Sequence, residues 1–221
     1  MSTLSKSLGA AGVRPTRAGE RRRLLVGAAS LALAAMVWSA LLWRSHARPP
    51  LPVLFSLPAF SLVDEQGRAF GSAQLAGRPY VADFVYTGCH DACPMLTARM
   101  GELQDFLQRD PSAVRLVTFT VDPEHDSPGK LAEYARASRA IPGLWSFVTG
   151  PVEQVSLLLE GGFKVSMPGS AGSERGAAGD LSHDSHFVVV DAKGRIRGYF
   201  EASPEGLARI RSALKDLLLG A

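Results

Sequence analysis

The chain has 221 residues and a formal net charge of +3, with 46% hydrophobic and 20% charged residues. This length allows one domain with a substantial core plus an additional segment. Eight basic residues and one acidic residue precede Pro49, so the remainder has sixteen basic and twenty acidic residues, a net of −4, which argues against a nucleic-acid-binding domain.

The N-terminal region has the pattern of a membrane anchor. Residues 1–23 form a basic tail with six basic residues and one acid, and residues 24–43 contain no charge. Twenty uncharged residues are long enough for a helix to cross about 30 Å of hydrocarbon. The basic flank predicts a cytoplasmic N-terminus, with everything after Trp43 exported to the periplasm or an equivalent compartment.

A cleaved signal peptide is the alternative interpretation of this segment. The apolar region of a signal peptide spans about 7–15 residues and is followed by a small-x-small cleavage site. Here the apolar run is longer and ends in "LLWR", with Trp43 suited to a membrane interface. We therefore expect an uncleaved, single-pass anchor in the inner membrane.

After the anchor, residues 44–58 contain four prolines and are expected to form an extended linker. The exported domain is expected over residues 59–221. It begins with "FSLVDEQGRAF", in which two short apolar runs flank Asp64-Glu65-Gln66-Gly67, a β-hairpin pattern.

Strand and helix patterns then alternate along the domain. We expect strands at 80–87, 114–121 and 144–150, helices at 94–108, 127–138 and 151–162, a hairpin over 186–200 and a final helix at 203–219. This order predicts an α/β, thioredoxin-like fold, a central mixed sheet flanked by helices with an N-terminal β-hairpin. Residues 168–180, rich in Gly, Ala and Ser, are expected to form a mobile loop.

The two cysteines of the chain, Cys89 and Cys93, lie in "YTGCHDACPML", where a buried strand gives way to a helix. Free amide groups and the helix dipole at such a position favour a thiolate. A disulfide there would close a very short loop and remove little chain entropy, so a purely structural bridge is disfavoured. Dithiol redox chemistry and metal binding both remain open.

The spacing favours a metal. Redox pairs usually have the spacing Cys-x-x-Cys, whereas Cys-x-x-x-Cys places both sulfurs on one face of a helical turn. Soft thiolates select Cu(I), zinc or iron–sulfur clusters. Two cysteines cannot supply a four-cysteine cluster, and a structural zinc site would need two histidines in addition.

A third ligand is predicted at His183, in "LSHDSHFVVVD", where the glycine-rich loop meets the strand before the hairpin. In a thioredoxin-like fold this junction faces the turn that carries the cysteines. His186 falls on the other side by period-two alternation and is expected to be structural. His90 is a candidate auxiliary ligand. No proline occurs between 169 and 203, where a general disulfide exchanger would have one facing its thiols.

These residues resemble the Sco/SenC family of membrane-anchored copper-delivery proteins. The resemblance covers about residues 53–219 and rests on "YTGCHDACP", on "TVDPEHDSPGKLAEYA" and on His183 eleven residues before Gly194. Two positions depart from the family pattern. His90 follows Cys89 where a proline is common, and Ser182 precedes His183 where an acid is common.

The resemblance implies a thioredoxin-like domain in which Cys89, Cys93 and His183 bind one copper ion. It further implies copper delivery to the binuclear copper centre of cytochrome c oxidase subunit II, or reduction of the thiols there. Another copper-accepting protein and a copper donor chaperone are further expected partners. A Cu(I) site of three ligands is expected, and a Cu(II) state would need one more, from Asp91 or His90. No covalent turnover is required, so the protein is not expected to be an enzyme.

Two alternatives remain. A thiol–disulfide oxidoreductase would use Cys89 to attack a partner disulfide and Cys93 to resolve it. A copper or redox sensor would signal through its thiol state, and the sequence shows no output domain for this.

Overall fold

The computed structural model separates the chain into two compact units, residues 1–49 and residues 50–221. It describes the residues 33, 35–39, 51–89, 92–110, 112–167 and 186–219. In the first unit, the described residues are helical. No helix within these described ranges has both the length and the apolar character needed to cross a bilayer. Most of the predicted anchor at 24–43 lies outside them, so the anchor stays a prediction.

The second unit is built on one mixed sheet of eight strands in the order β1-β8-β7-β4-β5-β6-β2-β3. Neighbours β4, β5 and β6 are parallel, and all other pairs are antiparallel. The strands are β1 Phe55–Ser56, β2 Ser61–Asp64, β3 Ala69–Gly71, β4 Tyr80–Val85, β5 Arg115–Thr120, β6 Trp145–Thr149, β7 His186–Val190 and β8 Arg195–Glu201.

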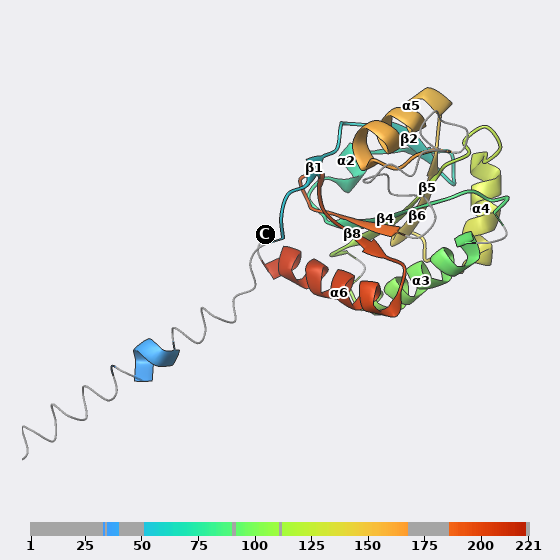
Figure 1. Cartoon of the computed structure of the whole chain (residues 1–221). Coiled ribbons are helices and arrows are strands. Elements are labelled where there is room, and N and C mark those ends of the chain that lie inside the picture. The colour runs from blue at the N-terminus through green and yellow to red at the C-terminus, as the bar shows by residue number, and fades with distance from the viewer. Residues whose placement is uncertain are drawn as a thin grey trace, which may run out of the picture. The chain divides into compact units, whose positions relative to one another are not determined.

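Helices cover both faces of the sheet, giving three layers (Figure 1). The first face packs against α3 Ala92–Leu107, α4 Pro128–Ala137 and α6 Pro204–Leu219. The second face packs against α2 Ser72–Leu75, α5 Val152–Ser156 and the π-helix η1 Leu157–Phe163. The predicted α/β architecture is confirmed.

The central strand β4 explains why the thiols have a rigid support. All six of its residues are buried, as expected for a strand covered on both faces. Tyr80, Ala82 and Phe84 pack beneath α5 and η1, whereas Val81 and Val85 pack beneath α3 and α6. The thiol segment therefore leaves a strand that is immobilised from both sides.

The predicted helix starts and hairpin turn are confirmed. The Ser127 hydroxyl accepts a hydrogen bond from the Lys130 amide at the start of α4, and the Ser203 hydroxyl accepts one from the Gly206 amide at the start of α6. Between β7 and β8 the chain turns at Gly194, whose positive φ of 72° suits glycine.

Two local features differ from the sequence pattern. Residues 55–56, inside the range expected to be linker, form β1, and the flanking Leu54 and Leu57 amides donate to Ile196 and Gly194 carbonyls of β8 and its turn. The helix expected at 151–162 is α only as far as Ser156 and continues as a π-helix to Phe163. The two glycines at 161 and 162 weaken regular α-helical propensity there.

Candidate metal centre

The thiol segment lies at the carboxyl end of the parallel strands. Strand β4 ends at Val85, the Cys89 amide donates to the Tyr86 carbonyl at 3.1 Å, and α3 begins at Ala92. Cys93 is therefore in the first helical turn. Ligand sites in sheets with parallel strands form at this edge, where strand ends and helix N-termini meet.

The structure brings the two predicted thiols together. The Cys93 amide donates a hydrogen bond to the Cys89 sulfur at 3.4 Å, and both cysteines are free thiols. Cys89 is partly exposed, whereas Cys93 is 7% exposed. Cys89 is thus the more exposed of the two cysteines, and Cys93 packs within the core.

The two thiols differ in their electrostatic environment. Burial raises the pKa of the Cys93 thiol to about 12, and its hydrogen bond with Cys89 acts in the same direction. At Cys93 the effect of burial therefore exceeds any stabilisation of a thiolate by the helix N-terminus. The Cys93 thiol is protonated at neutral pH, so a metal ion must displace its proton.

A buried carboxylate holds the thiol segment in place. Asp126, 1% exposed, accepts hydrogen bonds from the Thr87 amide at 3.1 Å and from the Thr120 hydroxyl at 2.6 Å. The Thr87 hydroxyl also donates to Asp126. Asp126 precedes α4, and Thr87 lies two residues before Cys89. The carboxylate therefore fixes the segment that carries the first sulfur.

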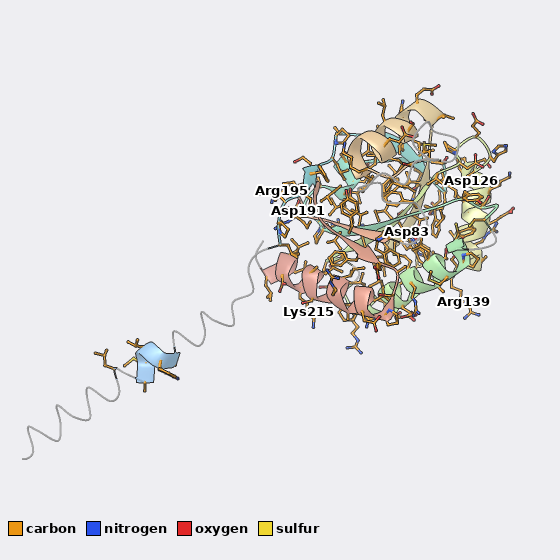
Figure 2. All side chains as sticks on the ribbon, in the orientation of Figure 1. Asp83, Asp126, Arg139, Asp191, Arg195 and Lys215 are labelled. Carbon is orange, nitrogen blue, oxygen red and sulfur yellow. The ribbon has the colours of Figure 1, made fainter. Side chains whose placement is uncertain are left out.

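A second buried carboxyl group lies on β4 itself. The Thr118 hydroxyl donates to Asp83 Oδ1 at 2.6 Å, and Trp145 Nε1 donates to the Thr118 oxygen at 2.8 Å. Asp83 Oδ2 has no hydrogen-bond partner in the described part of the chain. Burial raises the pKa of Asp83 to about 7. Figure 2 shows Asp83 in the interior of the domain.

Asp83 affects the pKa of the Cys93 thiol. Strand alternation places it on the same face of the sheet as Val81 and Val85, which pack in one cluster with Cys93. Its negative charge further raises the pKa of Cys93. Neither Asp83 nor Asp126 was predicted from the sequence. The available signals were an acid within the apolar strand "YVADFV" and the three acids of "VDPEHD".

The predicted third ligand is not described. His183, His90 and Asp91 all lie outside the described residues, so their roles stay predictions. Strand β7 starts at His186 and runs antiparallel to β4, which places its first residue at the edge of the sheet that carries the thiols. In the described ranges no three His, Cys, Asp or Glu side chains form a group able to hold a metal ion.

The other described histidines lie apart from the thiols. Strand alternation places His186 on the face of Val188 and Val190, opposite to that of Cys93. His125 is exposed, and its Nδ1 lies 2.8 Å from Asp122 Oδ1. His125 is therefore a loop residue, as expected.

Comparison with known proteins identifies the family. The sequence profile of the SCO1/SenC family matches residues 55–218. The chain belongs to the SCO1/SenC family. The SCO1 protein homolog of Bacillus subtilis is 29% identical over 149 residues, covering 66% of this chain and 73% of the homolog. A Stutzerimonas stutzeri protein, whose name proposes that it binds copper, is 30% identical over 170 residues. The match covers 75% of this chain and 80% of that protein.

A solved Sco structure has the same fold. BsSco, a member of the Sco family of cytochrome c oxidase assembly proteins, matches with a TM-score of 0.65 and 25% identity, covering 77% of this chain and 98% of BsSco. The likeness confirms the predicted thioredoxin-like arrangement of the domain. BsSco itself is reported to contain a disulfide switch.

Proposed function

We propose that this protein is a copper metallochaperone that binds one copper ion through Cys89, Cys93 and His183. The observation that carries the proposal is the pair of free thiols, with the Cys93 amide 3.4 Å from the Cys89 sulfur at the start of α3. Two thiolates form a soft donor set that suits Cu(I). Copper binding proposed for the Stutzerimonas stutzeri relative supports the same assignment.

The unequal exposure of the thiols suits cargo transfer. Cys93 is buried and held by the helix, so it supplies a fixed donor, whereas the partly exposed Cys89 is accessible to an acceptor. An incoming thiolate of the acceptor can therefore approach from the Cys89 side and exchange with the ligands. Copper is the cargo in this scheme, and no covalent bond in a substrate is made or broken.

The acceptor we propose is the binuclear copper centre of cytochrome c oxidase subunit II. Support comes from family membership and from BsSco, which belongs to a family of cytochrome c oxidase assembly proteins. The uncharged segment 24–43 and its basic flank would anchor the domain at the inner membrane, with the thiols in the exported compartment.

Anaerobic Cu(I) titration of the reduced protein against a competing chelator tests copper binding. We expect one-to-one binding that is weakened at least tenfold in Cys89→Ser, Cys93→Ser and His183→Ala. His125→Ala, which alters an exposed histidine, is the matched control and retains wild-type affinity. Unchanged affinity in His183→Ala would remove this histidine from the site.

A second function is favoured by the same pair of thiols. Two free cysteines in contact could reduce a disulfide of a partner, with Cys89 attacking and Cys93 resolving the mixed disulfide. This reaction predicts that His183→Ala retains most of the reductase rate on a disulfide peptide. The copper function predicts that the same variant loses copper, so the two measurements separate the functions.

A further inference from the structure

The end of the domain opposite the thiols carries a hollow of about 560 Å³. It lies at the amino ends of the parallel strands, because Pro79 and Ala113, which precede β4 and β5, line it. The β7–β8 turn with Lys193 and the last turn of α6 with Leu218 complete the lining. We call this region the basic end, defined by the lining residues Leu51, Arg78, Lys193 and Leu218 together with Arg115, which neighbours Arg78.

Three cations, Arg78, Arg115 and Lys193, gather at the basic end. Burial lowers the pKa of Arg115, and the positive charge of nearby Arg78 lowers it further. Among the described residues, neither guanidinium group forms an ion pair, nor does the Lys193 ammonium group. The exported part of the chain is negative overall, at −4, so a group of unpaired cations differs from the average charge of the domain.

The main acid of this region is already neutralised. Asp191 Oδ2 accepts hydrogen bonds from Arg195 Nε at 2.8 Å and from Arg197 Nη1 at 2.9 Å. The Asp191 residue is only 6% exposed. Arg78, Arg115 and Lys193 are therefore left to interact with an external anion. Asp216 is the remaining acid in the lining.

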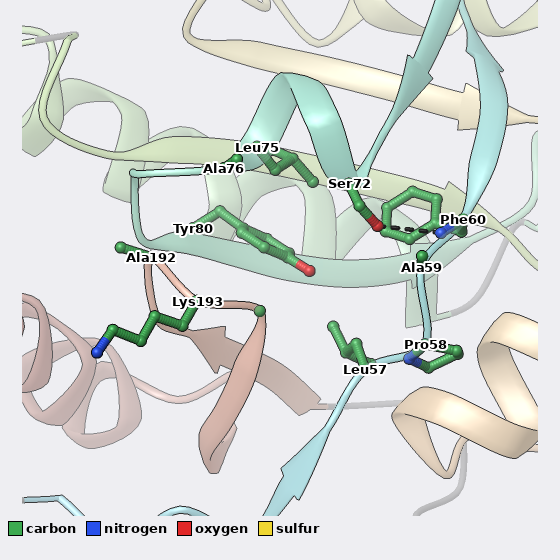
Figure 3. A pocket seen from close by; sticks show the side chains of 11 residues that line it. Leu57, Pro58, Ala59, Phe60, Ser72, Leu75, Ala76, Tyr80, Ala192 and Lys193 are labelled. Carbon is green, nitrogen blue, oxygen red and sulfur yellow. Dashed lines mark hydrogen bonds between the residues drawn. The ribbon is translucent and has the colours of Figure 1, made fainter.

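Apolar side chains accompany the positive charges. Leu219 at the end of α6 is 88% exposed and Leu218 is 43% exposed. A neighbouring hollow of about 300 Å³ is lined by Leu57, Leu75 and Tyr80 and shares Lys193 with the basic end. Figure 3 shows the Lys193 side chain extending away from this apolar lining. Exposed leucines beside free cations are typical of surfaces that bind at a lipid interface.

The chain reaches the domain at this same end. Arg197 Nε donates to the Pro52 carbonyl at 3.0 Å, and the same guanidinium group donates to the Leu51 carbonyl. These bonds hold residues 51 and 52, the first described residues of the domain, against strand β8. Eight residue steps separate Leu51 from Trp43, the end of the uncharged segment, and eight steps span at most about 28 Å.

We propose that the basic end docks on the anionic phospholipid headgroups of the membrane in which residues 24–43 are anchored. The docking rests on the membrane location in the proposed function. It places the amino ends of the parallel strands at the bilayer and directs the thiols away from it. The thiol edge and the basic end lie at opposite ends of strand β4, which has six residues. At the rise of a strand, this length corresponds to about 20 Å.

Release of the domain from vesicles tests the docking. The full-length protein, with a protease site inserted within residues 44–50, is reconstituted into phosphatidylcholine vesicles or into vesicles that also contain phosphatidylglycerol. After cleavage, sedimentation measures the fraction of domain that stays on each vesicle. We expect retention on the phosphatidylglycerol vesicles only, reduced at high salt because screening weakens the attraction.

Arg78→Gln and Lys193→Gln each remove one cation of the basic end. Each is expected to lower the partition coefficient about fivefold, the factor that corresponds to about 1 kcal/mol per basic residue near an anionic surface. Lys130→Gln is the matched control, because Lys130 is an exposed cation near the start of α4, at the thiol edge of the sheet. It is expected to leave the partition unchanged.

Three results would overturn the docking: no retention on phosphatidylglycerol vesicles, equal retention on both vesicles, or a loss in Lys130→Gln as large as that in Arg78→Gln. Cu(I) titration separates this proposal from the proposed function. Arg78→Gln and Lys193→Gln are expected to bind copper as the wild type does. A wild-type protein that binds vesicles but not copper would refute the chaperone function and leave the docking intact.

Discussion

At the residue scale, the buried carboxyl group of Asp83 is the least favourable feature of the core. It lies on the central strand, one oxygen accepts from Thr118, and the other has no partner in the described part of the chain. Burial raises its pKa to about 7, compared with about 3.9 in an unfolded chain. The folded protein therefore favours the protonated form.

This shift predicts a loss of stability with rising pH. Between about pH 4 and pH 7 the folded state holds a proton that the unfolded state has released, so the free energy of unfolding falls across this window. Above pH 7 the full cost is present, on the order of 4 kcal/mol. Asp83→Asn removes the ionisable group, so its free energy of unfolding should exceed that of the wild type at pH 8.

Urea unfolding of both proteins at pH 5 and pH 8 measures the effect. From pH 5 to pH 8, the free energy of unfolding of the wild type should fall more than that of Asp83→Asn. The same pH dependence in both proteins would show that Asp83 is ionised in the folded state throughout this range.

At the element scale, the thiol segment between β4 and α3 depends on Asp126, which ties it to β5 and to the start of α4. Three donors, from Thr87 and Thr120, converge on this one carboxylate. Its removal would leave buried donors without partners, and each such group costs about 1–3 kcal/mol. The same change would release the segment that precedes Cys89.

Asp126→Ala is therefore expected to lower the free energy of unfolding by about 3 kcal/mol and to weaken Cu(I) binding. Asp122→Ala is the control, because the Asp122 carboxylate pairs with the exposed His125, and its bonds to Thr120 and Asp126 are made by the backbone and are kept. Thermal unfolding and chelator competition measure both effects. Equal losses in the two variants would contradict a specific role for Asp126.

Helix caps provide a second prediction at this scale. The Ser203 hydroxyl accepts from the Gly206 amide at 3.0 Å at the start of α6, whose apolar side packs against β7 and β8. Ser203→Ala should cost about 1 kcal/mol of stability, and Ser203→Asp should retain the wild-type value. Urea unfolding of the two variants distinguishes loss of the cap from loss of the serine itself.

The elements also show what the sequence could and could not predict. Local patterns predicted the helices that begin near Ser127 and Ser203, the hairpin over 186–200 and the strand that is β4. Strand β1 could not be predicted, because two residues between prolines show no periodicity. Asp83 and Asp126 were missed because their partners Thr118 and Thr87 are 35 and 39 residues away in sequence.

At the scale of the whole molecule, the sheet separates two functional edges. The carboxyl ends of the parallel strands carry Cys89 and Cys93, and the amino ends carry the cations Arg78 and Lys193. The thiol pair was predictable because its residues are four apart in the chain. The basic end was not, because its residues lie far apart in the chain, from Leu51 to Leu218.

The central claim is that Cys89, Cys93 and His183 bind a single copper ion. X-ray absorption spectroscopy of the Cu(I)-loaded protein tests it most directly, with His186→Ala as the matched control. The claim predicts two sulfur neighbours and one nitrogen neighbour in the wild type and in His186→Ala, and loss of the nitrogen in His183→Ala. A wild-type site with sulfur neighbours alone, or a nitrogen that persists in His183→Ala, would contradict it.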